Sequence, residues 1–99
     1  MSDIVEMLKG YLNKHHLKFP NELINIVLTG DYALAKHTMM SDIDILLVFK
    51  GDIFKEDELI MKKLLNDFCE YPAINTLCIS NKSSNKKIKK EGVILWKRI

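Results

Sequence analysis

The stretch from Gly30 to Val48 constrains this chain more than any other part of the sequence. It contains Asp42 and Asp44, one residue apart, and an apolar run that starts at Ile43. Residues two apart on a β-strand point to the same face of a sheet, so both carboxylates would project side by side. Two like charges that close are unfavourable unless a cation neutralises them, and a divalent metal ion is the usual one. Upstream of this pair, Gly30 closes one apolar strand and opens a short helix. The acidic pair and this glycine turn together predict a metal-and-phosphate site.

A purely structural interpretation of the same residues also exists. Asp42 and Asp44 could be two solvent-facing acids where a strand leaves a loop, and Gly30 could serve a turn that needs glycine's backbone freedom. However, the run after Asp44 is continuously apolar, which is typical of a strand buried on both faces rather than of an edge strand. The pattern therefore favours a functional acidic pair.

Length and composition are those of one globular domain. The 99 residues are 47% apolar and 28% charged, so we expect a single domain over 1–99 with one core. No apolar run approaches the roughly 20 residues of a membrane span, and the acidic start M-S-D-I-V-E lacks the features of a signal peptide. Cys69 and Cys78 form no C-x-x-C pair, which predicts free thiols in a reducing cytoplasm rather than a disulfide or a zinc site.

Charge is unevenly distributed along the chain. Residues 81–99 carry a net charge of +6, and residues 1–80 carry a net charge of −4. A basic segment can bind nucleic acid or an acidic partner, but runs of charge are usually solvated surface. The segment Lys82–Lys90 contains no aromatic residue that could stack on bases, so nucleic-acid binding is the weakest of the functions considered.

Apolar spacing and turn residues predict the order α-β-α-β-α-β-α, followed by a short apolar tail. The expected segments are a helix with the stripe Ile4, Leu8, Tyr11, Leu12 and His15, a strand over Ile24–Leu28, a helix over Asp31–Lys36 capped by Asp31, a strand over Asp42–Phe49, a helix over Glu56–Phe68 with Ile60, Leu64 and Phe68 on its apolar face, a strand over Ala73–Ile79, a short helix ending at Glu91, and the tail Val93–Trp96. This alternation predicts an α/β (α+β) fold, a small mixed β-sheet flanked by helices.

The text around the acidic pair resembles the signature of the minimal nucleotidyltransferases of the DNA polymerase β superfamily, h-G-S-x-A-R-G-x-x-x-x-x-S-D-h-D-h-h-h, where h is apolar. The glycine matches Gly30, and the S-D-h-D element matches Ser41, Asp42 and Asp44 at the same spacing. The segment Ile88–Trp96 is similar to the family's closing I-x-x-E-G-x-x-L-aromatic segment. The resemblance covers nearly the whole chain and implies the polymerase β-like nucleotidyltransferase fold.

This resemblance implies roles for five residues. Gly30, Asp31 and Ser41 would bind the nucleotide, because the amides after the glycine face the phosphates at a helix N-terminus. Asp42 and Asp44 would be the catalytic residues, holding Mg²⁺ or Mn²⁺ on a nucleoside triphosphate. In the family, a third carboxylate from a neighbouring strand helps to hold a second ion that activates the attacking hydroxyl, and pyrophosphate leaves.

Four positions depart from the family pattern. Asp31 replaces a serine, Leu34 replaces an arginine, and Ala35 replaces a second glycine. Alignment of the family's h-D-h-h strand with Ile74–Leu77 puts Asn75 at the place of the third carboxylate. Asparagine carries no charge and is a poor proton acceptor. We therefore expect weakened nucleotide binding and slow or absent transfer.

Two functions of different classes follow. The resemblance implies an enzyme that moves a nucleoside monophosphate, AMP above all, from an NTP to a hydroxyl of a protein partner. Stand-alone domains of the family resemble antitoxins whose partner is a helical HEPN-type toxin, so such a partner is expected, and a homodimer is also compatible with the chain. The alternative is a catalytically inactive binding module with the same fold, which Asp31, Leu34 and Asn75 favour.

Overall fold

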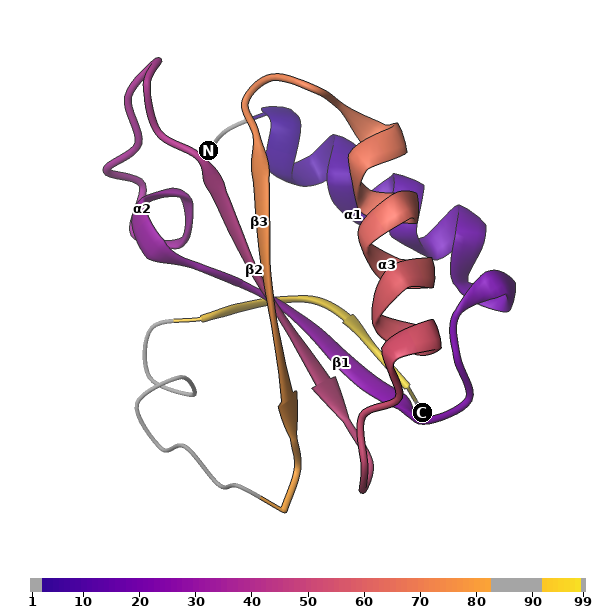
Figure 1. The fold of residues 1–99 in the computed structure, drawn as a ribbon. Helices are drawn as coiled ribbons and strands as arrows, with labels where there is room; N and C mark the ends of the chain where they lie inside the picture. The colour runs from indigo at the N-terminus through magenta and orange to yellow at the C-terminus, as the bar shows by residue number, and fades with distance from the viewer. Residues whose placement is uncertain (1–2, 83–91, 99) are drawn as a thin grey trace.

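The computed structural model describes residues 3–82 and 92–98, which form one mixed sheet with its longer helices on one face (Figure 1). The elements are α1 (Asp3–His15), the 3-10 turn η1 (His16–Lys18), β1 (Leu23–Thr29), α2 (Gly30–Ala33), β2 (Ile43–Phe49), α3 (Lys55–Phe68), β3 (Ile74–Ser80) and β4 (Val93–Lys97). The strand order across the sheet is β3-β2-β1-β4. The predicted α/β (α+β) fold with a small mixed sheet is therefore confirmed.

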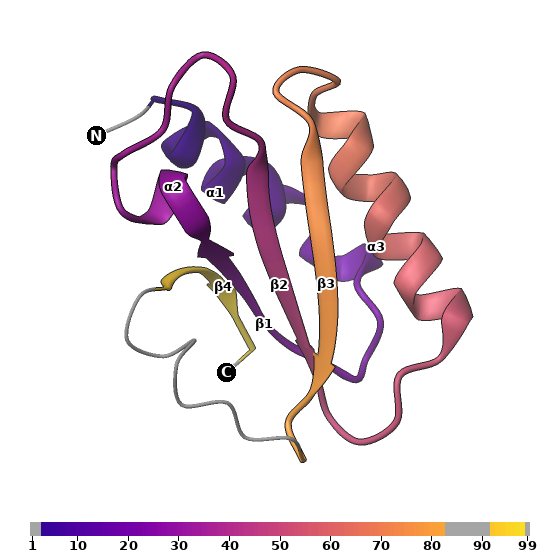
Figure 2. The same cartoon turned by 60° about the vertical axis from the view of Figure 1, so that its left-hand side comes forward.

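The sheet combines antiparallel and parallel pairing. β1 pairs antiparallel with β2 on one side and with β4 on the other. β2 and β3 run parallel, and α3 makes the crossover between them, as Figure 2 shows. Parallel neighbouring strands joined by a crossover both start at the same end of the sheet. The starts of β2 and β3 consequently lie together, beside the end of β1.

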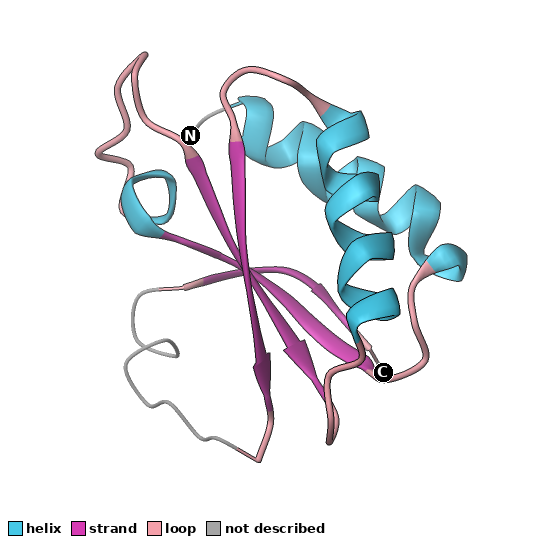
Figure 3. Ribbon diagram, viewed as in Figure 1, coloured by secondary structure: helices cyan, strands magenta, loops and turns pink. Residues whose placement is uncertain are grey.

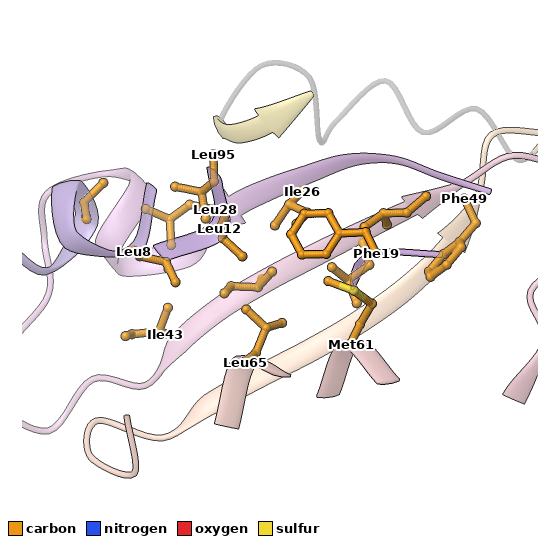
Figure 4. Packing of buried hydrophobic residues seen from close by; sticks show 14 residues of the cluster. Leu8, Leu12, Phe19, Ile26, Leu28, Ile43, Phe49, Met61, Leu65 and Leu95 are labelled. Carbon is orange, nitrogen blue, oxygen red and sulfur yellow. The ribbon is translucent and has the colours of Figure 1, made fainter. Parts of the chain in front are cut away.

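The core lies between the sheet and the two long helices, α1 and α3 (Figure 3). Its largest fully buried side chains are Leu8, Leu12, Leu23, Ile26, Leu28, Ile43, Ile45, Leu47, Phe49, Met61 and Leu65, several of which Figure 4 labels. On β2 the alternate residues Ile43, Ile45 and Leu47 face the helices, as the twofold periodicity of a strand requires. Leu46 is also buried, at 2% exposure, so the central position predicted for this strand is confirmed.

Three predicted segments differ from the structure. α3 packs through Met61 and Leu65, and the predicted Leu64 and Phe68 also lie against the core, whereas Ile60 is 45% exposed because the buried stripe is centred one residue further along the helix. The tail predicted at Val93–Trp96 is a fourth strand, β4, which pairs with β1. The helix predicted to end at Glu91 lies outside the described residues.

β4 is tied to the opposite end of the chain by Arg98. Its Nε donates to the carbonyl of Leu23 at 2.8 Å, and its Nη2 donates to the carbonyl of Pro20 at 3.0 Å. The guanidinium also lies 5.1 Å from the centre of the Trp96 ring. Trp96 in turn meets Phe19 edge-on at 4.8 Å, so polar and aromatic contacts together hold this strand.

Among the residues described, no helix is long and apolar enough to span a membrane.

α2 is shorter than predicted, and its position corrects the expected capping. The helix begins at Gly30 with Thr29 as its N-cap residue, so Asp31 lies within the first turn and the prediction that it caps the helix is wrong. The hydroxyl of Thr29 turns toward the carbonyl of Asp44 at 3.4 Å instead of capping the helix. The helix ends at Ala33 rather than Lys36, because Ala35 adopts a φ of +58°.

Among the residues that the structure describes, Ala35 is the one non-glycine residue with a positive φ. An L-residue with a Cβ pays roughly 1–2 kcal/mol in this left-handed region. The family signature has glycine at the same place, which gives that glycine a conformational reason. The turn after α2 is therefore strained in this chain where a glycine would relax it.

We expect Ala35→Gly to raise the free energy of unfolding by about 1 kcal/mol, because glycine adopts positive φ without a steric penalty. Chemical denaturation measures this directly. Ala33→Gly is the matched control, since the same exchange inside α2 should lower stability by roughly 0.5–1 kcal/mol. Equal destabilisation by both substitutions would contradict the assignment of strain to Ala35.

Candidate functional site

The turn from β1 into α2 brings Gly30 against the side chain of Asp44. Gly30 has a φ of +70°, and a Cβ built on it would lie 2.5 Å from Asp44 Oδ2 and 3.3 Å from Asp44 Cγ. Real Cβ atoms essentially never come that close to another heavy atom. Gly30 is therefore required twice, once for its backbone conformation and once for the room it leaves to a carboxylate.

Asp42 and Asp44 reach the same point from the start of β2. Parallel pairing sets Asp44 opposite Asn75 on β3. The Nδ2 of Asn75 donates to Asp42 Oδ2 at 3.0 Å and to Asp44 Oδ1 at 3.3 Å. β2 begins at Ile43, one residue later than predicted, yet both carboxylates lie on one side of the sheet, as strand periodicity predicts.

This convergence is the observation that tests the fit of a metal ion. Two carboxylate oxygens already share one hydrogen-bond donor, which means that they approach a common centre from two directions. A divalent cation prefers such oxygen ligands, and rotation of the Asn75 amide would present its Oδ1 in place of its Nδ2. Within residues 3–82 and 92–98, no group of three or more His, Cys, Asp or Glu side chains could hold a metal. The residues therefore fit an ion that takes further ligands from phosphate oxygens.

Asp31 and Ser41 lie together next to this centre. Ser41 Oγ accepts a hydrogen bond from the amide of Thr38 at 2.9 Å and points to Asp31 Oδ2 at 3.5 Å, the limit for a hydrogen bond. Asp31 lies in the first turn of α2, and Ser41 lies in the segment that links α2 to β2. An ionised carboxylate at Asp31 repels phosphate and donates no hydrogen bond, in contrast to the serine of the family pattern. Ser41 fixes the turn that precedes Asp42.

A shallow cavity of about 330 Å³ opens on the face of the sheet away from the long helices. It is lined by Thr29, Asp44, Ile45, Leu46, Asn75, Thr76 and Leu77. Asp42, Asp44 and Asn75 together are called the acidic centre here. Asp44 and Asn75 make one end of the cavity lining polar, while Leu46 and Leu77 make the other end apolar. Such a combination suits a ligand with a charged end and a flat apolar end.

Two features of the site region were missed by sequence reasoning. Leu77 lies two residues after Asn75 on β3, so strand periodicity alone could have placed it on the same face. The Tyr71 hydroxyl donates to the carbonyl of Met39 at 2.8 Å and joins the two loops that lead into β2 and β3. No spacing rule connects residues 32 positions apart, so this contact had no signal in the sequence.

Both cysteines are free and half-buried. Burial raises the pKa of the Cys78 thiol to about 11, and the neighbouring Glu58 carboxylate adds to that effect. Burial also raises the pKa of Cys69, whose thiol donates to the carbonyl of Pro72 at 3.4 Å. Both thiols stay protonated at neutral pH, so neither is suited to act as a nucleophile.

Solved structures show the same fold. A structure described as a nucleotidyltransferase from Sulfolobus solfataricus is 25% identical to this chain, with a TM-score of 0.57 over 95% of this chain and 80% of the other. A toxin–antitoxin structure with AMP-PNP is 20% identical, with a TM-score of 0.60 over 91% of this chain and 73% of the other. A complex of a tri-AMPylated HEPN toxin with its MNT antitoxin from Shewanella oneidensis is 17% identical, with a TM-score of 0.54 over 95% and 73% of the two chains.

No curated protein sequence matches this chain. The family model of the nucleotidyltransferase domain, in contrast, matches residues 10–95, a range that contains β1, the turn at Gly30, the acidic pair and most of β4. With the sheet order, the Gly30–Asp44 contact and the shared point of Asp42, Asp44 and Asn75, this match leads to one conclusion. The chain belongs to the nucleotidyltransferase domain family.

Proposed function

We propose that this protein binds a metal–NTP complex and transfers the nucleoside monophosphate, AMP above all, to a hydroxyl of a protein partner. The observation that carries the proposal is the convergence of Asp42 and Asp44 on one point beside Gly30. Asp42 and Asp44 would hold Mg²⁺ or Mn²⁺, which when bound neutralises charge on the triphosphate. The room left by Gly30 lets the backbone of the turn approach a phosphate.

The reaction class fixes what the chain has to supply. The acceptor oxygen forms a bond to the α-phosphorus, the bond to the pyrophosphate oxygen breaks, and the hydroxyl proton leaves for solvent. Positioning and charge neutralisation provide most of the acceleration in such a transfer. Asn75 lies where a third carboxylate would accept that proton or add negative charge, and an amide does neither. Transfer by this chain is therefore expected to be slow.

An antitoxin role in a toxin–antitoxin pair is the biological setting that we propose. Two of the three structures named above are described as toxin–antitoxin assemblies, and one contains an AMPylated HEPN toxin. The side chains of Met39, Met40 and Tyr71 are exposed on the two loops that lead into β2 and β3, and they would offer apolar contacts to a protein that brings the acceptor hydroxyl. We propose a HEPN-type helical protein as that partner.

An inactive binding module is the second candidate function. It is favoured by one observation, the two hydrogen bonds from Asn75 to the acidic pair. These bonds offset the repulsion between the carboxylates without any cation, so the site is stable in the absence of a nucleotide. The protein would then act on its partner through surface contacts alone.

Calorimetric titration with ATP separates these candidates. We expect binding that requires Mg²⁺ or Mn²⁺ and weakens on the order of tenfold or more in Asp44→Asn, because one of two ligand charges is lost. Asp52→Asn is the matched control, since it removes an equal charge from an exposed acid beyond the far end of β2. Absence of metal-dependent binding in the wild-type protein would reject the enzyme proposal and leave the binding module.

A pair of glycine substitutions tests the contact with Asp44. Gly30→Ala and Gly51→Ala both force alanine into positive φ, at +70° and +73°, which costs roughly 1–2 kcal/mol each. Only at Gly30 does the new Cβ meet Asp44, because nothing lies within 4 Å of a Cβ at Gly51. We expect both variants to lose stability in denaturation, and only Gly30→Ala to lose metal-dependent ATP binding. Equal ATP affinity in the two variants would remove Gly30 from the site.

Asn75→Asp restores the family's third carboxylate. We expect a lower melting temperature without metal, because three carboxylates then converge, and a larger rise with Mg²⁺ than the wild-type protein shows. Transfer of label from radiolabelled ATP to a HEPN-type protein should also become faster. Asn66→Asp on exposed α3 surface is the control of equal charge. If Mg²⁺ stabilises both variants equally, Asn75 does not occupy a metal-ligand position.

A further inference from the structure

β3 forms an outer edge of the sheet with one side of its backbone unpaired. In the order β3-β2-β1-β4 it has β2 as its neighbour, and within the described ranges 3–82 and 92–98 no other strand pairs with it. Its seven residues, Ile74–Ser80, run in unbroken register with β2. An edge strand of this length presents a row of N–H and C=O groups to any strand that can reach it.

This edge lacks the features that usually prevent strand pairing. Natural edge strands are protected by charged residues, proline or a β-bulge. The stretch from Ala73 to Asn81 contains neither charge nor proline, and the pairing with β2 contains no bulge. β4, the opposite edge, has two of these protections, because Lys97 ends it, Arg98 follows, and a register shift interrupts its pairing with β1.

An exposed leucine marks the middle of the edge strand. Leu77 is 61% exposed, on the same face as Asn75 and two residues from it. On the other face of the strand, Cys78 lies beside Glu58 of α3. Glu58 and Lys62 form an ion pair at 3.7 Å, and both side chains interact electrostatically with Cys78 of β3. The midpoint of β3 therefore has an apolar side chain on one face and two opposite charges on the other.

We propose that the β3 edge pairs antiparallel with β3 of a second copy of this chain, about a twofold axis at Leu77. The two four-stranded sheets would then form one continuous sheet. The axis sets Leu77 against its own copy, Thr76 against Cys78 of the second copy, and Asn75 against Ile79 of the second copy. Residues directly opposite in antiparallel strands lie on one face with Cβ atoms roughly 4.5–5.5 Å apart.

Self-complementarity is the reason for choosing a second copy over another protein as the partner. An isologous interface needs each patch to match itself, residue i meeting j and j meeting i. The uncharged strand meets this requirement along its length, and the Glu58–Lys62 pair meets it on the helix side, where each carboxylate approaches the ammonium group of the second copy. The pairing also sets Ile79 of the second copy beside Asn75, so each dimer half contributes an apolar side chain to the border of the other's acidic centre.

Sedimentation equilibrium on the full chain tests the proposal without any nucleotide. We expect a dimer for the wild-type protein, and at least a tenfold higher dissociation constant for Leu77→Lys, which puts two ammonium groups together at the axis. Ile94→Lys is the matched control, because Ile94 is 53% exposed on the opposite edge strand. A monomeric wild-type protein at high concentration, or a dimer disrupted by Ile94→Lys and not by Leu77→Lys, would overturn the proposal.

A charge exchange on α3 tests the position of the axis. Lys62→Glu should weaken the dimer, and the double variant Glu58→Lys/Lys62→Glu should restore it, since opposite charges face each other again across the axis. Lys63→Glu, an equal change on an exposed neighbour, should leave the dimer intact. Melting temperatures of each variant separate a loss of dimer from a loss of helix stability. Weakening by Lys63→Glu equal to that by Lys62→Glu would place the interface elsewhere. Because the readout is the mass of the free protein, the outcome is independent of whether the acidic centre binds ATP.

Discussion

Parallel pairing of β2 with β3 is the constraint on which the acidic centre depends. Because of this pairing, both strands start at the same end of the sheet, and Asp44 lies opposite Asn75. α3 enforces this direction, because two parallel neighbours need a crossover, and the helix buries Met61 and Leu65 in the core while it spans the sheet. The apolar packing that stabilises the fold thus also determines where the carboxylates meet.

The acidic centre has one feature that suits a bound cation and one that makes a cation unnecessary. The Asp44 carboxylate lies so close to Gly30 that a methyl group on Gly30 would collide with it. Asn75, at the same time, donates hydrogen bonds to both aspartates and makes their proximity tolerable without a cation. An amide in this place weakens the electrostatic demand for a metal ion without removing the oxygen ligands that would bind one. The two functions proposed above, slow transfer and partner binding alone, differ in whether a nucleotide occupies the centre.

Local patterns in the sequence were sufficient for most of the fold. Alternation and helical spacing placed β1, β2, β3, α1 and α3 to within one or two residues, and the spacing from Gly30 to the S-D-h-D element pointed to the site. The errors lie where contacts override local preference. Asp31 is a good capping residue by type, yet α2 begins earlier because Gly30 turns the chain against Asp44. The tail Val93–Trp96 was not predicted as a strand, because its pairing with β1 joins segments far apart in the chain that no local pattern relates.

The sequence by itself determined the residue types of the acidic centre, including an amide at Asn75, and the order of the main elements. These depend on composition and on spacings of a few residues, which a strand or helix converts directly into a shared face. Only the tertiary structure decided that the Asn75 amide lies within hydrogen-bonding distance of both aspartates and that the β3 edge is left unpaired among the described residues. Contacts between residues more than thirty positions apart depend on how the sheet is assembled, because no local periodicity relates one strand to the next.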